Sequence, residues 1–224
     1  MNILAIDTST ANLTLALFSE GKIIAKRNKK SQGILSESII PIIDGALKKA
    51  VLSLSDIDCF AVGLGPGSFT GLRVGLATIK GFATALKIPI IGVSSLDIIA
   101  SNVRKDNVQI CIVLDARRGN VFAAIYNKEN GVLKRSGEYF LAPIDELLKR
   151  IKKQAVFCGD GVSIYKDKII NSGKALLIEE EKNWFPKAEN LIMLALKKAA
   201  LKEFANNDTL KPLYLYPDDC QVQK

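Results

Sequence analysis

Residues 3–7 read Ile-Leu-Ala-Ile-Asp, and residues 111–115 read Cys-Ile-Val-Leu-Asp. Each stretch is an apolar run that ends in an aspartate, and each is followed by a second apolar run, at 13–18 and at 121–126. Both runs recur at an offset of 108 residues without a gap. Short strands with short connections favour antiparallel pairing, and recurrence at a fixed distance indicates an internal repeat. The sequence therefore predicts a fold that uses one strand arrangement twice.

Helices and strands alternate around both copies. An apolar stripe at helical spacing predicts a helix over 35–50, which Pro41 should bend or break. Residues 28–33 are polar and basic, which is typical of a loop. Further strands are expected at 22–27, 58–63, 89–93, 132–140 and 155–158, and further helices at 70–86, 96–103, 143–152 and after Pro186. This alternation predicts an α/β protein of two lobes, residues 1–104 and a smaller lobe 105–224, each a mixed β-sheet flanked by helices.

The composition excludes several kinds of site. The chain has 224 residues, with 31 basic and 23 acidic side chains, a formal net charge of +8 and no histidine. A protein without imidazole has no Ser-His-Asp triad, no Cys-His dyad and no histidine-ligated metal. We therefore expect neither a metal centre nor a bound cofactor.

The cysteines and the apolar runs indicate the compartment. The four cysteines, at 59, 111, 158 and 220, form no C-x-x-C pair, and the first three lie in strand-like apolar runs. A thiol in such a run is usually a small core residue, so a disulfide framework is not expected. No apolar run reaches the ~18 residues of a membrane span, and the N-terminus lacks the basic region and cleavage site of a signal peptide. These features predict a reduced, cytoplasmic protein without membrane contact.

Asp7, Thr8 and Ser9 follow the first strand and form a candidate ligand loop. Ligands of open α/β sheets bind at the carboxyl ends of the strands. Phosphate-binding loops use glycine so that backbone N–H groups approach closely, and this loop has none. The alternative is an Asx or Ser/Thr turn that closes the hairpin.

The most unusual segment is residues 63–73, Gly-Leu-Gly-Pro-Gly-Ser-Phe-Thr-Gly-Leu-Arg. It lies between a predicted strand and a predicted helix, as a phosphate loop would. It matches neither G-x-x-x-x-G-K-[ST] nor G-x-G-x-x-G. A tight turn with positive φ, followed by an N-capped helix, explains the same residues.

The helix after this segment is rich in small residues. Gly71 and Gly75 are four apart, and Ala77, Gly81 and Ala85 form a second row at the same spacing. A glycine inside a helix costs about 0.8–1 kcal/mol against alanine, so a compensating gain is expected. Close approach of another helix would supply it, either within the chain or from a partner protein.

Basic residues cluster at 26–30, 117–118, 149–153 and 197–198. A net charge of +8 favours contact with nucleic acid or another acidic partner. The clusters are scattered along the chain, and no aromatic-rich strand accompanies them as a base-stacking platform. Solvated surface lysines are the alternative reading.

Three segments, 3–10, 63–73 and 114–117, closely resemble the TsaB (YeaZ-like) family of tRNA threonylcarbamoyladenosine biosynthesis proteins. The resemblance is strong from Met1 to Tyr126 and looser as far as 212–215. It implies two tandem actin/Hsp70-like (ribonuclease-H-like) lobes. It also implies a non-catalytic role beside TsaD, the subunit that transfers the threonylcarbamoyl group to adenosine 37 of tRNA. Recruitment of the ATPase TsaE, self-association as a homodimer and an indirect contact with tRNA are implied as well.

The sequence departs from the family pattern at Leu35-Ser36-Glu37, where many relatives have His-Ser-Glu. Leu35 stands in place of that histidine. A metal site like that of TsaD is therefore not expected, and Asp7, Thr8 and Ser9 would form at most a vestigial nucleotide loop. The replacement also makes the helix more apolar, which suits a docking surface.

These observations lead to a docking hypothesis. The helices over 35–50 and 70–86 would form one face that binds the catalytic subunit, with the glycines admitting close backbone approach. The predicted interface residues are Leu35, Glu37, Ile39, Pro41, Phe69, Gly71, Leu72, Gly75 and Leu76. The alternatives are an autonomous peptidase or a kinase-like enzyme of the same fold, or a purely structural homodimer.

Overall fold

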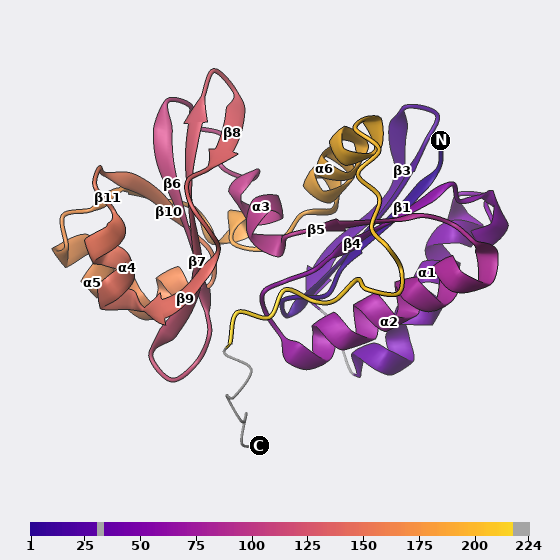
Figure 1. Cartoon of the computed structure of the whole chain (residues 1–224), viewed down its shortest axis with the longest axis horizontal. Coiled ribbons are helices and arrows are strands. Elements are labelled where there is room, and N and C mark those ends of the chain that lie inside the picture. Colours follow the sequence, from indigo (N-terminus) through magenta and orange to yellow (C-terminus); the bar gives the residue numbers. More distant parts are fainter. Residues whose placement is uncertain (31–33, 217–224) are drawn as a thin grey trace. The chain divides into compact units, whose positions relative to one another are not determined.

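The computed structural model describes residues 1–30 and 34–216, which form two compact units (Figure 1). The first unit contains Met1–Asn102 and Phe185–Pro212. The second contains Val103–Trp184 and the segment that begins at Leu213. Within the described ranges, none of the helices is long and apolar enough to cross a membrane.

The sheet of the first unit has five strands in the order β3-β2-β1-β4-β5. They are β1 (Ile3–Asp7), β2 (Asn12–Ser19), β3 (Lys22–Lys30), β4 (Cys59–Gly63) and β5 (Ile90–Val93). The first three are antiparallel, whereas β1, β4 and β5 are parallel. Every residue of β1 and β4 is buried, as expected for central strands covered on both faces.

Helices cover both faces of this sheet (Figure 1). Alternate residues of β1 point to opposite faces. Leu4 and Ile6 pack in one core with α1 (Leu35–Lys49) and α2 (Phe69–Leu86). Ile3 and Ala5 pack in the other with α6 (Ala188–Ala200). The short helix α3 (Ser95–Ala100) also contributes to that second core, and a 3-10 turn, η1 (Leu54–Asp56), precedes β4.

The sheet of the second unit repeats the strand order as β8-β7-β6-β10-β11, with β9 paired to β7. Its strands are β6 (Val108–Asp115), β7 (Asn120–Glu129), β8 (Val132–Arg135), β9 (Phe140–Pro143), β10 (Ala155–Cys158) and β11 (Ala175–Ile178). Helices α4 (Ile144–Arg150) and α5 (Gly161–Asn171) pack on one face, and η2 (Glu181–Asn183) follows β11. The predicted repeat and the mixed sheets flanked by helices are confirmed.

The two copies differ in the register of the first hairpin. Asp7 is opposite Thr14, whereas Asp115 is opposite Val121. An offset of 108 would place Asp115 opposite Phe122, so the connection in the second hairpin is one residue shorter than in the first. Because side chains alternate between the two faces of a sheet, this change of one residue in register places each side chain of β7 on the opposite face from its counterpart in β2.

Several boundaries differ from the predictions. The helix α1 runs through Pro41 without a break. Strand β3 continues to Lys30, where a loop was expected from 28 to 33, and residues 31–33 lie outside the described ranges. Helix α5 and strand β11 were not predicted, because the apolar residues of α5 do not form a clear stripe.

The main correction concerns the last helix. The predicted lobes divide the chain once near residue 104, and the change of unit after Asn102 lies close to that point. The segment from Phe185 to Pro212, however, belongs to the first unit and not to the second. Leu191 of α6 packs against the face of β1 that carries Ile3 and Ala5. The Thr14 hydroxyl donates to the carbonyl of Pro186 at 2.8 Å, which anchors the return of the chain.

The cysteines occupy the predicted core positions. Cys59, Cys111 and Cys158 are buried in β4, β6 and β10. Burial, with a smaller contribution from Asp58, raises the pKa of Cys59 to about 12, and burial alone raises that of Cys111. Cys220 lies outside the described residues.

Candidate partner interface and the Asp7 loop

The Asp7 carboxylate is the most enclosed polar group of the predicted site. It ends β1, is completely buried, and accepts three hydrogen bonds. Its Oδ1 accepts from the amide and the hydroxyl of Ser9, at 2.8 and 2.6 Å. Its Oδ2 accepts from the hydroxyl of Ser95 at 2.6 Å. Burial raises the pKa of Asp7, and these hydrogen bonds only partly oppose the shift.

Gly63 and Gly65 close the space around this carboxylate. A β-carbon on Gly63 would lie 1.9 Å from Oδ2 of Asp7, so only glycine fits there. Gly65 has a φ of +87°, and its amide donates to Ser95 Oγ at 3.1 Å. Ser68 Oγ accepts from the amide of Gly71 at the start of α2. The tight turn with positive φ and the N-capped helix, offered as the structural reading of 63–73, are therefore present.

Thr8 and Ser9 are bound to the same glycine-rich segment. The Thr8 hydroxyl donates to the carbonyl of Gly71 at 2.7 Å, and the Ser9 carbonyl accepts from the amide of Ser68 at 2.7 Å. Both side chains are 2% exposed. The contact from the Ser9 amide to Asp7 is the expected Asx-type turn. A nucleotide would reach these atoms only if the glycine-rich segment moved away.

The structure corrects the explanation given for Gly71 and Gly75. A β-carbon on Gly71 would lie 2.2 Å from the Thr8 carbonyl oxygen, and one on Gly75 would lie 2.2 Å from Thr8 Oγ1. Both glycines are buried. They make room for the loop after β1 and not for a partner helix, so the compensating contact is internal.

The other predicted interface residues divide into two groups. Ile39, Leu72 and Leu76 are buried within the first unit, so they support the face from inside and do not form its surface. Glu37, Pro41 and Phe69 are exposed, and Leu35 is half-buried. Phe69 is 49% exposed, and the Arg73 guanidinium lies over its ring at 3.8 Å.

One surface feature on these helices was missed by the sequence reasoning. Ile40 is 54% exposed although it belongs to the apolar stripe of α1. Beside it opens a hollow of about 410 Å³, lined by Ile40, Ile43, Asp44, Leu47, Lys48, Leu52, Ser53, Leu54 and Phe82. Because Ile39 and Ile40 are adjacent, the apolar stripe of α1 is wider than one buried face needs. This extra width was the feature of the sequence from which the exposure of an isoleucine could have been predicted.

The second row of small residues noted in the sequence forms a surface feature of α2. Ala77, Gly81 and Ala85 are exposed at four-residue spacing. A β-carbon on Gly81 would meet nothing within 4 Å. This second row of the sequence, and not the pair Gly71 and Gly75, is therefore the one that lies open on the outside of the helix.

Comparison with known proteins identifies the family of this chain. The family model "TsaD: tRNA N6-adenosine threonylcarbamoyltransferase" matches residues 29–220. The tRNA threonylcarbamoyladenosine biosynthesis protein TsaB of Escherichia coli is 31% identical over 221 residues, which cover 96% of this chain and 94% of that protein. The chain belongs to the TsaB family. YeaZ from Pseudomonas aeruginosa, a solved structure, has a TM-score of 0.80 at 26% identity and covers 96% of this chain and 99% of its own.

The fold implied by the TsaB resemblance is confirmed as well. A Bacteroides thetaiotaomicron protein with an actin-like ATPase fold has a TM-score of 0.50 at 8% identity, with 86% of this chain and 95% of that chain covered. At this identity the likeness concerns the fold alone. This TsaB-family chain thus consists of two mixed sheets of the actin-like arrangement, each flanked by helices.

Proposed function

We propose that this chain is a non-catalytic docking subunit of tRNA threonylcarbamoyladenosine synthesis, and that the outer face of α1 and α2 binds the catalytic subunit TsaD. The observation that carries the proposal is the exposure of Ile40, Pro41 and Phe69 on these two helices, together with the hollow beside Ile40. Ile40 forms a continuous apolar surface with Ile43, Leu47, Leu52, Leu54 and Phe82, which line the hollow, and contiguous apolar surface of this kind marks an interaction site.

The chemistry of the chain supports docking in preference to catalysis. The sequence contains no histidine, and Leu35 replaces the family's histidine at the start of α1. The three hydrogen bonds of Asp7 come from Ser9 and Ser95 of the chain itself. The contribution to the reaction is then indirect: binding to the active conformation of TsaD increases the population of that conformation.

The small residues of α2 allow close approach of a partner helix. The surface row of Ala77, Gly81 and Ala85 presents no side chain beyond a methyl group. Backbones of two helices can then come nearer than large side chains allow, with Ile40 and Phe69 supplying apolar area. A specific complex of standard size buries about 1,600 Å² in total.

The proposal of further partners is based on family membership. Recruitment of the ATPase TsaE and an indirect contact with tRNA belong to the same proposal. The basic side chains supply sequence-independent attraction to tRNA in the assembled complex. Without TsaD, the exposed apolar side chains of α1 and α2 favour a homodimer through the same face.

The decisive experiment compares two substitutions at Gly81. Gly81→Leu places a bulky side chain in the open row and should abolish co-purification with TsaD. Gly81→Ala adds only a methyl group and should retain it. Because nothing lies within 4 Å of the added β-carbon, both variants should fold like the native chain in circular dichroism. Retained binding by a folded Gly81→Leu variant would refute the assignment of this face.

A second measurement separates docking from autonomous catalysis. Synthesis of modified tRNA by the purified components should require this chain together with TsaD. The chain alone should show no transfer, no peptidase activity and no tight binding of Mg²⁺-ATP. Turnover by the isolated chain would favour the enzyme alternatives, and a stable homodimer that ignores TsaD would favour the purely structural one.

A further inference from the structure

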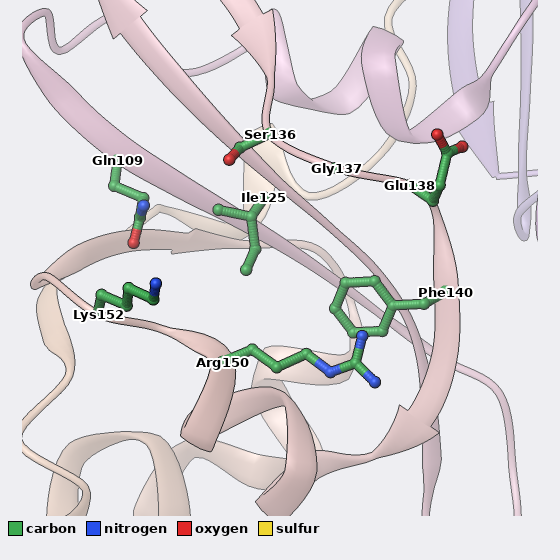
Figure 2. A pocket seen from close by; sticks show the side chains of 8 residues that line it. All are labelled: Gln109, Ile125, Ser136, Gly137, Glu138, Phe140, Arg150 and Lys152. Atoms are coloured by element: carbon green, nitrogen blue, oxygen red, sulfur yellow. The ribbon is translucent and has the colours of Figure 1, made fainter.

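The second unit contains a pocket that the proposed function does not use (Figure 2). It has a volume of about 330 Å³, at the small end of the range for ligand pockets. It lies between β6, the β8–β9 connection and the end of α4. It is lined by Gln109, Ile125, Ser136, Gly137, Glu138, Phe140, Arg150 and Lys152.

Gln109 carries the feature that points to a ligand. Its Oε1 is buried, and it has no hydrogen-bond partner among the residues that the structure describes. Its amide nitrogen reaches Asn127 Oδ1 only at 3.5 Å. A buried carbonyl oxygen without a donor destabilises the folded chain. Gln109 projects into the pocket (Figure 2), so a turn of its side-chain amide would present this oxygen to a donor group on a bound molecule.

The charge in the pocket is positive. Lys152 lies on its rim, is exposed, and forms no ion pair within residues 1–30 and 34–216. The Arg150 guanidinium lies 4.5 Å from the centre of the Phe140 ring and pairs with Glu146. The carboxylate of Glu138 is 90% exposed and points away from Gln109 and Lys152 (Figure 2). An anionic group would therefore be attracted to the Lys152 side.

The floor of the pocket is apolar. Ile125 is buried and Phe140 is half-buried, and both belong to the core beneath α4. The hydroxyl of Ser136 adds a small polar group to the lining. The pocket thus combines an unsatisfied acceptor, a lysine without an ion pair among the described residues, and an apolar floor within a small volume.

We propose that this pocket binds a nucleotide. Its phosphate would pair with Lys152, its sugar or base would lie against Ile125 beside the Arg150 guanidinium that covers Phe140, and an N–H or O–H group would donate to Gln109 Oε1. An inorganic anion without a proton, such as sulfate, would leave the Gln109 oxygen without a donor, and an apolar ligand would leave the Lys152 ammonium without a counter-ion. A nucleotide carries all three kinds of group, and it could be a free mononucleotide or one residue of an RNA.

The first arm of the test uses AMP with the full chain. Binding is measured by calorimetry and by the shift of the Gln109 side-chain amide resonance. Ribose 5-phosphate, which lacks the base, is the comparison ligand and should bind at least about tenfold more weakly. Lys152→Ala and Gln109→Leu should each weaken AMP binding by about tenfold or more, which is the loss expected for one hydrogen bond between protein and ligand. Lys153→Ala, one residue away and outside the pocket lining, should change little.

Gln109→Leu provides a readout that a merely structural role would not give. Replacing an unsatisfied buried amide by an apolar side chain of similar shape should leave the melting temperature unchanged or raise it. Weaker AMP binding without loss of stability would separate ligand recognition from folding.

The second arm uses a short single-stranded oligoribonucleotide in fluorescence anisotropy with the same three variants. Binding of AMP that depends on Lys152 and Gln109 identifies a free nucleotide as the ligand. Binding of the oligoribonucleotide alone, with the same dependence, identifies RNA. Failure of both probes to bind, or equal effects of Lys152→Ala and Lys153→Ala, would overturn the proposal. Neither result depends on docking to TsaD.

Discussion

The Thr8 side chain occupies the space that a β-carbon on Gly75 would need. Its Oγ1 lies 2.2 Å from the position of that carbon, and its Cγ2 lies 3.1 Å away. The same hydroxyl donates to the carbonyl of Gly71 one turn earlier in α2. Two glycines of one helix thus accommodate a single residue that lies more than sixty positions earlier in the chain. The packing of the loop after β1 against α2 explains both glycines without any partner.

This contact predicts opposite effects at two glycines of one helix. Gly75→Ala should lower the free energy of unfolding by about 1–3 kcal/mol, because the backbone or Thr8 must move. Gly81→Ala should raise it by about 0.5–1 kcal/mol, because the helix propensity improves and the added methyl group meets nothing within 4 Å. Chemical denaturation of both variants measures the difference. Equal stability of the two variants would contradict the packing described for Thr8.

A double mutant tests the cause directly. Thr8→Ala removes the oxygen that the new methyl group would strike, at the expense of its bond to Gly71. The combination Thr8→Ala/Gly75→Ala should be more stable than the sum of the two single effects predicts. Strict additivity would mean that Gly75 is constrained by something other than Thr8.

The buried carboxylate of Asp7 predicts how stability depends on pH. Burial raises its pKa above the unfolded value of 3.8, so the folded state holds this proton more tightly. The stability contributed by the protonated form is fully present below pH 3.8. It is lost as the pH rises through the pKa of the folded state. The Asp7→Asn variant lacks this titration, so its stability relative to the native chain should increase from acid pH towards neutrality.

Asp56 provides a matched control with the opposite sign. Hydrogen bonds from the hydroxyl and amide of Ser53 lower the pKa of this exposed carboxylate. Its contribution to stability is present above pH 3.8 and is lost as the pH falls. Relative to the native chain, the stability of Asp7→Asn should therefore rise as the pH increases above 3.8, whereas that of Asp56→Asn should rise as the pH falls below 3.8. Parallel changes would contradict the assignment of the Asp7 shift.

The core thiols should be unreactive in the folded chain. Because the thiolate is the nucleophile, a pKa of about 12 at Cys59 leaves almost none of it ionised at pH 8. In a Cys220→Ser background, Cys59, Cys111 and Cys158 should react with a thiol reagent only at the rate of unfolding. Addition of denaturant should release all three at once. Rapid labelling of the native variant would contradict their burial.

The last helix should be essential to the first unit. Leu191 is completely buried against the sheet, whereas Met193, two residues later, is 56% exposed. Leu191→Ala should lower the free energy of unfolding by about 2–5 kcal/mol, because it removes buried methyl groups and leaves a cavity. Met193→Ala should change it by less than about 0.5 kcal/mol. Thermal unfolding measures both, and similar effects would contradict the docking of α6 on β1.

The local order of the elements was predictable from the residues. The apolar runs of β1 and β6, each ending in an aspartate, and the helical stripe of α1 are signals that need no knowledge of distant contacts. The family resemblance rests on equally local motifs, such as residues 63–73. In contrast, α5 was missed because its burial is confined to a few positions, Gly161, Val162 and Ile169, which do not form a clear stripe.

Long-range packing decided which unit each element joins and which residues reach the surface. The residue types alone placed a strand, a turn and a small-residue helix in succession and excluded imidazole chemistry. They left open what fills the space over Gly71 and Gly75, because a glycine signals close approach without naming the neighbour. Only the folded chain puts Thr8 in that space, returns α6 to β1, and leaves Ile40 and Gly81 exposed. The physical reason is that burial depends on atoms far apart in sequence, whereas propensity and periodicity depend on neighbours.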